Sequence, residues 1–356
     1  MMETVNIVLP DATRPLDPGV VSRLLERHAS DSSIRIVIAT GAHRVPDVER
    51  ERRRLEIPRE VPLFVHDCDA AHERLGEWEY DPAILSAQRN ILVGPITFHY
   101  LAGFGGGRKL IAPGCLSRKS ITALHRLSYD QDCSGPASGT GMGCLEGNPF
   151  HAALVEAAKR IGGEIETVNL LPSGEEIRGD LVSAHREACR RYLEENCIEI
   201  AEPAERALVR QPHDTDLYQA HKALVAAAQA TREGGEITLM ARCPAGFGPK
   251  GFAEALEWPT IEEHASRLRK NFQVPVATAL SLRRLAQRFR IRILSDLLPG
   301  ERLGRIGITV LPETEDRNVR GETYDLVLPR GAATLPVVKR CHSCSLSISR
   351  SESDKR

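Results

Sequence analysis

Residues 90–114 read NILVGPITFHYLAGFGGGRKLIAPG, in which a mainly apolar run passes directly into a glycine-rich loop. The run at 90–93 has the composition of a buried strand. Four of the five residues from Gly103 to Gly107 are glycines, and ordering them costs backbone entropy. A fold that accepts this cost usually brings its backbone close to another group, and successive N–H groups are suited to an anion. The stretch therefore predicts a strand followed by a candidate anion-binding loop.

This loop matches neither of two common phosphate-binding motifs. A Walker A loop ends in Gly-Lys-Ser/Thr, whereas here Arg108 precedes Lys109 and Leu110 follows it. In a GxGxxG pattern that begins at Gly103, Arg108 stands where the third glycine belongs. Two readings remain open: a loop that holds an anion, and a glycine-rich connection that carries a solvated lysine.

The composition is that of a globular protein with no preference for charged polymers. The chain has 356 residues, enough for two domains, and 42% of them are hydrophobic. The 47 Lys and Arg residues balance the 48 Asp and Glu residues, so no overall field attracts nucleic acid or an acidic membrane. Aromatic residues make up only 4%, which also argues against base stacking. We expect neither nucleic acid nor membrane as a partner.

Segments that would direct the chain out of the cytoplasm are not apparent. No apolar stretch approaches the roughly 18 to 20 residues that span a bilayer. The first ten residues lead into a strand pattern and lack the basic start and apolar core of a signal peptide. The 9 cysteines are scattered and odd in number, which favours free thiols. We therefore expect a cytoplasmic protein.

Strands and helices alternate along the first two hundred residues, which predicts an α/β domain at 1–203. The strands are expected at 5–9, 34–39, 61–65, 91–96 and 165–171, and the helices at 20–27, 120–127, 150–161 and 181–195.

A second, smaller α/β domain is predicted at 204–340, because the alternation restarts after a polar stretch at 202–205. Its strands are expected at 237–241, 291–294, 306–311 and 324–328, and its helices at 217–232, 261–270 and 276–289. The tail at 341–356 is rich in Ser and charge and is predicted to be disordered. Cys341 and Cys344 form a CxxC there without a second pair, which favours a frayed end over a metal site.

Polar clusters follow three strands of the first predicted domain. Asp11 follows the first strand, His43 follows the second, and the segment from His99 to Lys109 follows a later one. In open α/β sheets, ligands bind outside the carboxyl ends of the strands. The three clusters are therefore expected to share one site.

The first cluster, Asp11-Ala12-Thr13-Arg14-Pro15, is suited to an anionic group. Arg14 offers a planar fork that fits a carboxylate or phosphate, and Pro15 restricts the backbone of Arg14 to an extended conformation. Asp11 would hold Arg14 in place. An Asp–Arg pair that only stabilises a turn is an equally open reading.

Histidines supply the candidate proton-transfer groups. A single histidine at a strand end is more often structural, but His43 and His99 stand at two strand ends beside a glycine-rich loop, which favours acid–base work. His125 lies on a predicted helix and is a candidate metal ligand or a surface residue. Asn148 and Pro149 are suited to capping the next helix, so a catalytic role for His151 is the weaker reading.

The second domain offers a further polar face. Tyr218, Gln219 and Lys222 begin a predicted helix at spacings of three and four residues, so they share one face. This face is suited to gripping an anionic substrate, and a solvated helix end is the alternative. The turn Cys243-Pro244-Ala245-Gly246-Phe247-Gly248 is a candidate lining of the cleft.

The order of these clusters resembles that of the nickel-dependent lactate racemase family. The matching motifs, over residues 5 to roughly 330, are Asp11-x-Thr13-Arg14-Pro15, Gly41-x-His43-Arg44, His99 with Lys109 and His125, Gly147-Asn148-Pro149-x-His151, and Gln219-x-x-Lys222. The resemblance implies two α/β domains with a cofactor and substrate site in the cleft between them.

The resemblance also implies a nickel-pincer nucleotide, a pyridinium mononucleotide with two sulfur groups that hold nickel. Lys109 would be its attachment point and His125 the nickel ligand from the protein, and imidazole with soft sulfur suits nickel. Gly105, Gly106 and Gly107 would let the backbone approach this cofactor. Separate maturation proteins would build it and would therefore be partners.

By the same resemblance, the activity is racemisation or epimerisation of a 2-hydroxy acid by hydride abstraction and return. His43 and His99 would be the two acid–base groups, because racemisation needs one on each side of the substrate. Arg14, with Asp11 beside it, would bind the substrate carboxylate. Gln219, Lys222 and Tyr218 would contact the substrate from the second domain.

One departure from the family pattern bears on the substrate. The family's lactate enzymes usually carry a tryptophan among the later helices of the second domain, but Trp258 comes early here and Arg283 and Arg284 occupy that region. The substrate is therefore lactate or a larger, more polar 2-hydroxy acid. The alternative functions are a non-catalytic anion-binding protein on the same scaffold and a zinc-type hydrolase that uses His43, His99 and His125.

Overall fold

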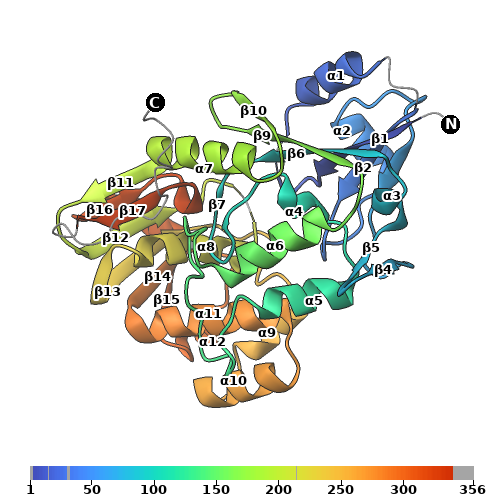
Figure 1. The fold of residues 1–356 in the computed structure, drawn as a ribbon. Helices are drawn as coiled ribbons and strands as arrows, with labels where there is room; N and C mark the ends of the chain where they lie inside the picture. Colours follow the sequence, from blue (N-terminus) through green and yellow to red (C-terminus); the bar gives the residue numbers. More distant parts are fainter. Residues whose placement is uncertain (1–2, 15, 30–32, 214, 340–356) are drawn as a thin grey trace, which may run out of the picture. The chain divides into compact units, whose positions relative to one another are not determined.

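The computed structural model describes residues 3–14, 16–29, 33–213 and 215–339, which form two compact units (Figure 1). The first unit comprises the described residues up to Thr97, with Phe104–Leu127 and Asn148–Tyr192. The second comprises Phe98–Gly103, Ser128–Gly147 and the described residues from Leu193 onward. Residues 98–103 and 128–147 thus group with the second unit although they precede the boundary predicted after residue 203. The predicted tail at 341–356, with Cys341 and Cys344, lies outside the described residues, as does Pro15.

The first unit is built on a six-stranded sheet in the order β10-β9-β6-β1-β2-β3. The strands are β1 (Thr4–Pro10), β2 (Ser33–Ala39), β3 (Leu63–Val65), β6 (Arg89–Pro95), β9 (Glu164–Leu170) and β10 (Glu176–Gly179). All neighbours are parallel except β10, which pairs antiparallel with β9. The apolar side chains of β1, β2 and β6 are buried in one core with those of helix α1, as strands covered on both faces require.

Short helices and two hairpins complete the first unit and its connections. The helices are α1 (Pro18–Arg27), α2 (Val48–Arg54), α3 (Pro82–Leu85), α4 (Arg108–Ile111), α5 (Arg118–Arg126), α6 (Pro149–Lys159) and α7 (Ser183–Asn196). The hairpins pair β4 (Glu73–Leu75) with β5 (Trp78–Tyr80), and β7 (Phe98–His99) with β8 (Gly103–Phe104). The predicted cap is confirmed, since the Asn148 side chain accepts from the backbone N–H of His151 and Pro149 begins α6.

The second unit is built on a five-stranded parallel sheet in the order β15-β14-β13-β12-β16. The strands are β12 (Ala204–Arg210), β13 (Thr231–Met240), β14 (Arg290–Leu294), β15 (Ile308–Leu311) and β16 (Leu326–Leu328), and a separate parallel pair joins β11 (Cys197–Ile200) to β17 (Leu335–Val338). The predicted α/β class is therefore confirmed in both units.

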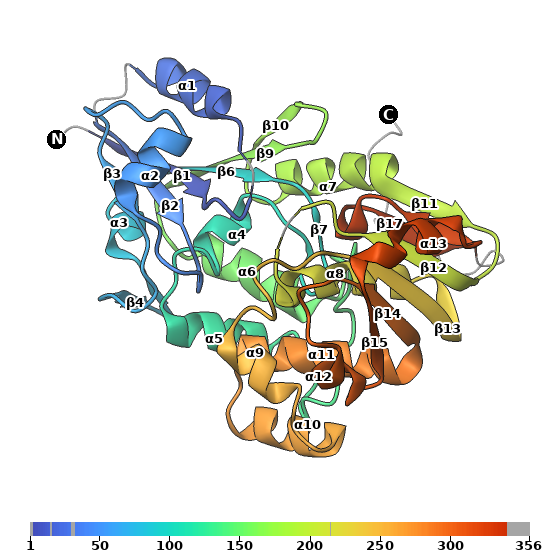
Figure 2. The same cartoon turned by 180° about the vertical axis from the view of Figure 1, so that it is seen from behind.

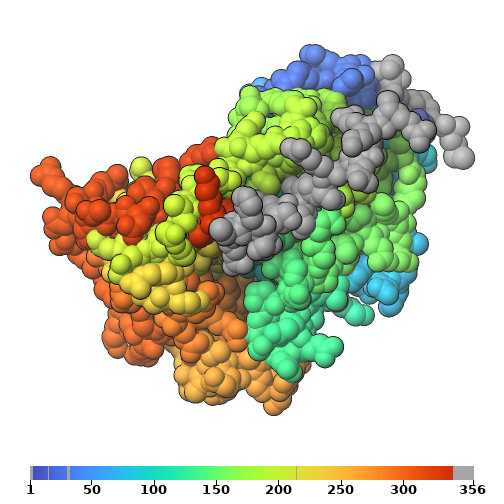
Figure 3. Space-filling view, turned by 60° about the vertical axis from the view of Figure 1, so that its left-hand side comes forward, coloured from blue at the N-terminus to red at the C-terminus, as the bar shows by residue number. Residues whose placement is uncertain are grey.

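Helices α8 and α11 pack against this second sheet and against each other (Figures 1 and 2). The helices of this unit are α8 (Leu217–Ala228), α9 (Lys250–Ala255), α10 (Ile261–Lys270), α11 (Val274–Arg288), α12 (Gly300–Gly304) and α13 (Asp316–Gly321), with 3₁₀ turns η1 (Glu313–Glu315) and η2 (Gly331–Ala333). Helix α10 presents exposed charged side chains on the unit's surface, at the bottom of Figure 3. No helix in the described part of the chain combines the length and apolar character that crossing a bilayer requires.

The segment from 204 to 232 of the second unit differs from the sequence-based expectation. The helix predicted at 217–232 ends at Ala228, and β13 already begins at Thr231. Strand β12 was not predicted at all, because Glu205, Arg206 and Arg210 interrupt its apolar pattern. Ion pairs formed by Arg206 explain how this strand tolerates charge inside a sheet.

Candidate functional site

The carboxyl ends of β6, β1 and β2 bring the predicted strand-end clusters of the first unit to one edge of its sheet. These three strands are neighbours and parallel, so the segments that follow Pro10, Ala39 and Pro95 leave on the same side. The backbone N–H of Gly41 donates to the Gly114 carbonyl over 2.9 Å and links two of these segments directly.

Asp11 and His43 form a hydrogen-bonded pair at this edge. Asp11 Oδ2 lies 2.7 Å from His43 Nδ1, and Asp11 Oδ1 accepts from the backbone N–H of Thr13 over 3.1 Å. Burial raises the pKa of Asp11, but the hydrogen bond and charge of His43 outweigh it and hold that pKa below its usual value. When the His43 ring is neutral, its Nδ1–H donates to the ionised Asp11, and the lone pair lies on Nε2.

Arg14 is connected to this pair through Thr13. The Arg14 backbone N–H donates to the Asp11 carbonyl over 3.1 Å, and its guanidinium Nη1 donates to Thr13 Oγ1 over 3.0 Å. Thr13 Oγ1 in turn donates to Asp11 Oδ1. Asp11 thus orients Arg14 through the turn and not through a direct ion pair among the described contacts.

The glycines of the loop allow it to pack closely on β6 and β9. A Cβ atom at Gly106 would lie 2.7 Å from both His185 Cδ2 and Ile96 Cδ1, and one at Gly107 would lie 3.0 Å from the Leu92 carbonyl oxygen. The backbone N–H of Gly105 donates to the Thr97 carbonyl and that of Gly107 to Asn169 Oδ1. Close packing therefore accounts for these glycines, and their predicted contact with a cofactor stays a prediction.

Arg108 is a buried cation at the centre of this loop that sequence analysis did not select. Its guanidinium donates to the carbonyls of Phe104 and Gly105, over 3.0 and 2.6 Å, and also bonds His151 Nδ1 and His185 Nε2. Burial lowers the pKa of Arg108 to about 10. Burial and the charge of Arg108 in turn lower the pKa of His151 to about 3, so that histidine is neutral. The only feature of the sequence that could have indicated this buried cation was an arginine next to a run of glycines.

His125 has the environment expected of a metal ligand. His125 Nδ1 donates to the Ile121 carbonyl over 2.8 Å, which places the ring lone pair on Nε2. Burial and, to a smaller extent, the nearby Lys109 charge lower the pKa of His125 to about 4, so the imidazole is neutral as metal binding requires. The donor chemistry of His125 therefore fits the implied nickel cofactor, and the role of Lys109 as its attachment point stays a prediction.

His99 lies in the second unit, next to Tyr100. Its Nδ1 atom accepts from the backbone N–H groups of Leu101 and Ala102, over 3.2 and 3.0 Å. An acceptor at Nδ1 leaves the proton of the neutral ring on Nε2. His43 and His99 are therefore held in opposite tautomers, with a lone pair on Nε2 in one and an N–H on Nε2 in the other.

The polar face predicted on α8 is present. Asp216 caps the helix by accepting from the Gln219 backbone N–H, and Lys222 Nζ donates to Gln219 Oε1 over 2.6 Å. The backbone N–H groups of Leu217 and Tyr218 donate to carbonyls of Gly246 and Phe247. The turn from Cys243 to Gly248 therefore fixes the start of the helix that carries Tyr218, Gln219 and Lys222.

Tyr100 ties α8 to α11 within the second unit. Its ring lies edge-on to that of His221, with centroids 5.2 Å apart, and its hydroxyl lies 3.2 Å from Thr278 Oγ1. Tyr129 reaches the same helix, because its hydroxyl donates to the Ala277 carbonyl over 2.9 Å. Trp258 lies elsewhere, packed against His264 and under the Arg267 guanidinium.

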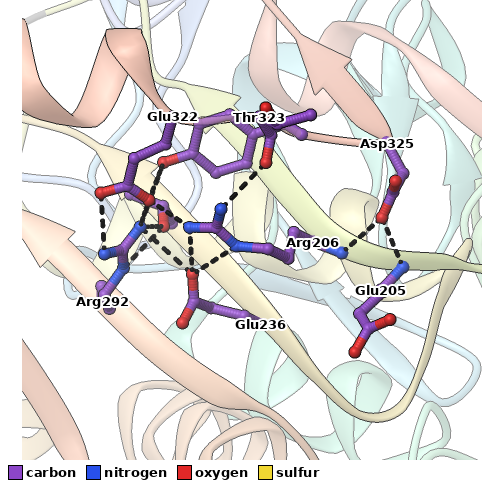
Figure 4. Close-up of polar contacts among 9 residues, drawn as sticks. Glu205, Arg206, Glu236, Arg292, Glu322, Thr323 and Asp325 are labelled. Carbon is purple, nitrogen blue, oxygen red and sulfur yellow. Dashed lines mark hydrogen bonds and ion pairs between the residues drawn. The ribbon is translucent and has the colours of Figure 1, made fainter.

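A separate cavity of about 380 Å³ lies at the amino ends of β13, β14 and β15, and none of the predicted site residues lines it. It adjoins an ion-pair network in which Arg206 and Arg292 contact Glu236 and Glu322 (Figure 4). The two arginines and two glutamates balance, so the network explains the charges on β12 without a ligand.

In the described part of the chain, one cluster of potential metal ligands contains a cysteine sulfur. Asp67, Cys68 and Asp69 are the only three potential ligands there whose donor atoms lie within 4.8 Å of one another. Both oxygens of Asp69 already bind Arg118 over 2.6 Å, and burial raises the pKa of Cys68. The seven described cysteines are free thiols, as predicted.

Comparison with known proteins finds similarity to lactate racemases. Residues 1–135 match the family model described as the lactate racemase N-terminal domain. A lactate racemase of Thermoanaerobacterium thermosaccharolyticum is 28% identical over 271 residues, which cover 70% of this chain and 62% of that protein. One of Lactiplantibacillus plantarum is 29% identical over 269 residues, with the same coverage of 70% and 62%. The chain thus spans under two thirds of the length of these curated relatives.

Solved structures share the fold. The lactate racemase apoprotein of T. thermosaccharolyticum superposes with a TM-score of 0.82 at 23% identity, covering 95% of this chain and 87% of that one. A crystal structure of a Thermotoga maritima protein superposes with a TM-score of 0.71 at 15% identity, covering 95% and 94%.

Proposed function

We propose that this chain, which is similar in sequence to lactate racemases, racemises or epimerises a 2-hydroxy acid. The observation that supports this most directly is the Asp11–His43 pair, 2.7 Å apart at the carboxyl ends of adjacent strands. A buried carboxylate that holds an imidazole by Nδ1 makes Nε2 a base of fixed direction.

The proposed reaction needs one group that accepts the hydroxyl proton of the substrate and one that donates to the substrate oxygen. Removing the hydroxyl proton of a 2-hydroxy acid while hydride leaves its carbon gives a planar 2-oxo acid, and return of hydride to the other face inverts the centre. His43 takes the hydroxyl proton at Nε2 and Asp11 stabilises the resulting imidazolium. When hydride returns to the other face, the His43 imidazolium gives its proton back to the substrate oxygen, so no net proton is lost. His99 donates a hydrogen bond from Nε2–H to that oxygen, since its Nδ1 is engaged by two backbone N–H groups.

The remaining roles follow the residues' chemistry. Arg14 binds the substrate carboxylate, and Tyr218, Gln219 and Lys222 orient the substrate from α8. Lys109 would tether the nickel-pincer nucleotide and His125 would bind its metal through Nε2. When bound, this cofactor would supply the hydride acceptor. Its maturation proteins are the partners that the proposal requires.

The test uses protein co-expressed with the cofactor-building enzymes. Intact mass and peptide mapping should find a sulfur-containing mononucleotide on Lys109 with about one nickel per chain. Chiral chromatography should then show racemisation of a 2-hydroxy acid, which Lys109→Ala abolishes. Lys119→Ala, at an exposed lysine of α5, is the matched control and should retain activity.

Solvent deuterium distinguishes the proposed hydride route from proton abstraction at carbon. Hydride return keeps the original hydrogen at the carbinol carbon, so racemised product formed in D₂O should contain no deuterium there. Incorporation of deuterium would overturn the hydride route. An unmodified Lys109, with ligand binding but no turnover, would instead support the anion-binding alternative.

A further inference from the structure

Arg283 and Arg284 are adjacent on α11 but have opposite environments. Arg283 is only 7% exposed, and its guanidinium contacts His264 Nδ1 at 3.5 Å and the Pro259 carbonyl at 3.3 Å. His264 accepts at Nδ1 because its Nε2–H donates to the Val276 carbonyl. Arg283 is therefore occupied in holding α10 and α11 together.

Arg284 makes no hydrogen bond or ion pair among the residues that the structure describes. Its side chain is half-buried, and its Nε atom is inaccessible to solvent yet has no acceptor. A buried N–H group of a guanidinium that lacks an acceptor is costly, and more so than a neutral one. This arginine is therefore a donor that requires a partner from outside the described contacts.

Neighbours of Arg284 in the second unit include Gly135 and Tyr129. Its Nη1 atom would lie 3.3 Å from a Cβ atom at Gly135. Ala277 lies two turns earlier on the same face of α11, and the Tyr129 hydroxyl binds the Ala277 carbonyl. Burial raises the pKa of Tyr129; Tyr100, and Tyr218 at the start of α8, add to this rise, and the Arg284 charge opposes it, so these groups lie within electrostatic reach of Tyr129.

The carboxylate of Asp130 is the local competitor for this guanidinium. It also lies near Gly135, but its two oxygens accept from the backbone N–H and the hydroxyl of Ser134, each over 2.7 Å. Asp130 is thus engaged in closing its own turn.

We propose that Arg284 binds a second carboxylate on the substrate, so that the preferred substrate is a 2-hydroxy dicarboxylate and not lactate. This inference rests on the proposed function, and it assigns Arg284 as the residue that determines specificity. The planar fork of arginine matches a carboxylate in two parallel hydrogen bonds, which a methyl group or a neutral polyol does not reproduce.

The experiment compares racemisation of malate, lactate and gluconate by loaded wild-type enzyme and by loaded Arg284→Gln and Arg284→Lys. Wild type should prefer malate in kcat/KM. Arg284→Gln should lower kcat/KM for malate about 10- to 100-fold, mainly through KM, and leave lactate turnover within about threefold, which also shows that the variant folds. Arg284→Lys should restore part of the malate activity. Arg288→Gln removes a cation of the same helix that pairs with exposed Glu233 and should change neither substrate.

Different failures have different meanings. Preference for lactate or gluconate, or an equal loss on malate and lactate in Arg284→Gln, would overturn the role of Arg284 while the proposed function stands. Absence of turnover with every 2-hydroxy acid in the loaded wild type would overturn the proposed function and this inference with it.

Discussion

At the scale of single residues, the hydrogen-bond partner of each histidine at the candidate site determines which ring nitrogen carries the proton. His43 is held by a carboxylate, His99 by backbone N–H groups and His125 by a backbone carbonyl. Each partner selects one tautomer, so the neutral rings of His43 and His125 carry the lone pair on Nε2, whereas that of His99 carries the proton there.

Asp11→Asn tests the carboxylate that orients His43. An amide neither stabilises the imidazolium nor enforces the tautomer, so kcat should fall about 100-fold with KM for the substrate nearly unchanged. Steady-state kinetics of the loaded enzyme measures this. Asp47→Asn, which alters the cap of α2, is the control for loss of an acidic side chain. Unchanged kcat in Asp11→Asn would contradict the role of His43 as the base.

Arg108→Met tests the buried cation of the loop. Methionine fills much of the volume but leaves the carbonyls of Phe104 and Gly105 without their donor, which should cost about 3 kcal/mol of unfolding free energy. Denaturant unfolding of the unloaded protein measures this. Arg118→Met removes an exposed arginine and should cost far less. Equal losses would show that Arg108 has no special part in holding the loop.

At the scale of elements, the glycine-rich loop is shaped by the sheet beneath it. Gly106 has φ of +103°, a region that favours glycine, and a side chain at this position would clash with His185 and Ile96. The loop that carries Lys109 therefore depends on β6 and β9 for its conformation.

Gly106→Ala should destabilise the protein more than the backbone conformation alone explains. Gly174 also has positive φ, +87°, but no atom lies within 4 Å of its Cβ position. Gly174→Ala should therefore cost only about 1 kcal/mol from backbone strain, and Gly106→Ala distinctly more because of the clash. Denaturant unfolding of both variants tests this, and equal costs would mean that the loop moves freely to accept a side chain.

At the scale of the whole molecule, buried neutral histidines couple stability to pH. Burial is the main cause in each case and lowers the pKa of His151 and His221 to about 3 and that of His264 to about 4. These histidines are spread over both units, so their effect is on the fold and not on one site.

The unloaded protein should lose stability as pH falls from about 6.5 towards 4. In this window the histidines are protonated in the unfolded chain but stay neutral in the folded protein. The free energy of unfolding therefore decreases by about 1.4 kcal/mol per pH unit for each such histidine. Urea unfolding between pH 7.5 and 4.5 measures the slope, and His264→Gln should reduce it by about one proton. Constant stability across this range would contradict burial of the neutral rings.

Local patterns were sufficient to predict the alternating strands and helices, the Asn148–Pro149 cap and the polar clusters after β1, β2 and β6. Periodicity and capping depend on near neighbours in sequence, which the amino-acid order displays directly. The resemblance to the lactate racemase family rested on spacing of the same kind, from Asp11 to Lys222, and the comparisons confirm it.

Tertiary structure decided what those patterns leave open. It pairs Asp11 with His43, buries Arg108 between two histidines, and lets Arg206 find Glu236 and Glu322 so that a charged segment becomes strand β12. It also gives Arg283 and Arg284 different surroundings, although they are adjacent and of the same residue type. The physical reason is that burial, charge and hydrogen-bond partners come from segments distant in sequence, and those neighbours decide what a side chain can bind.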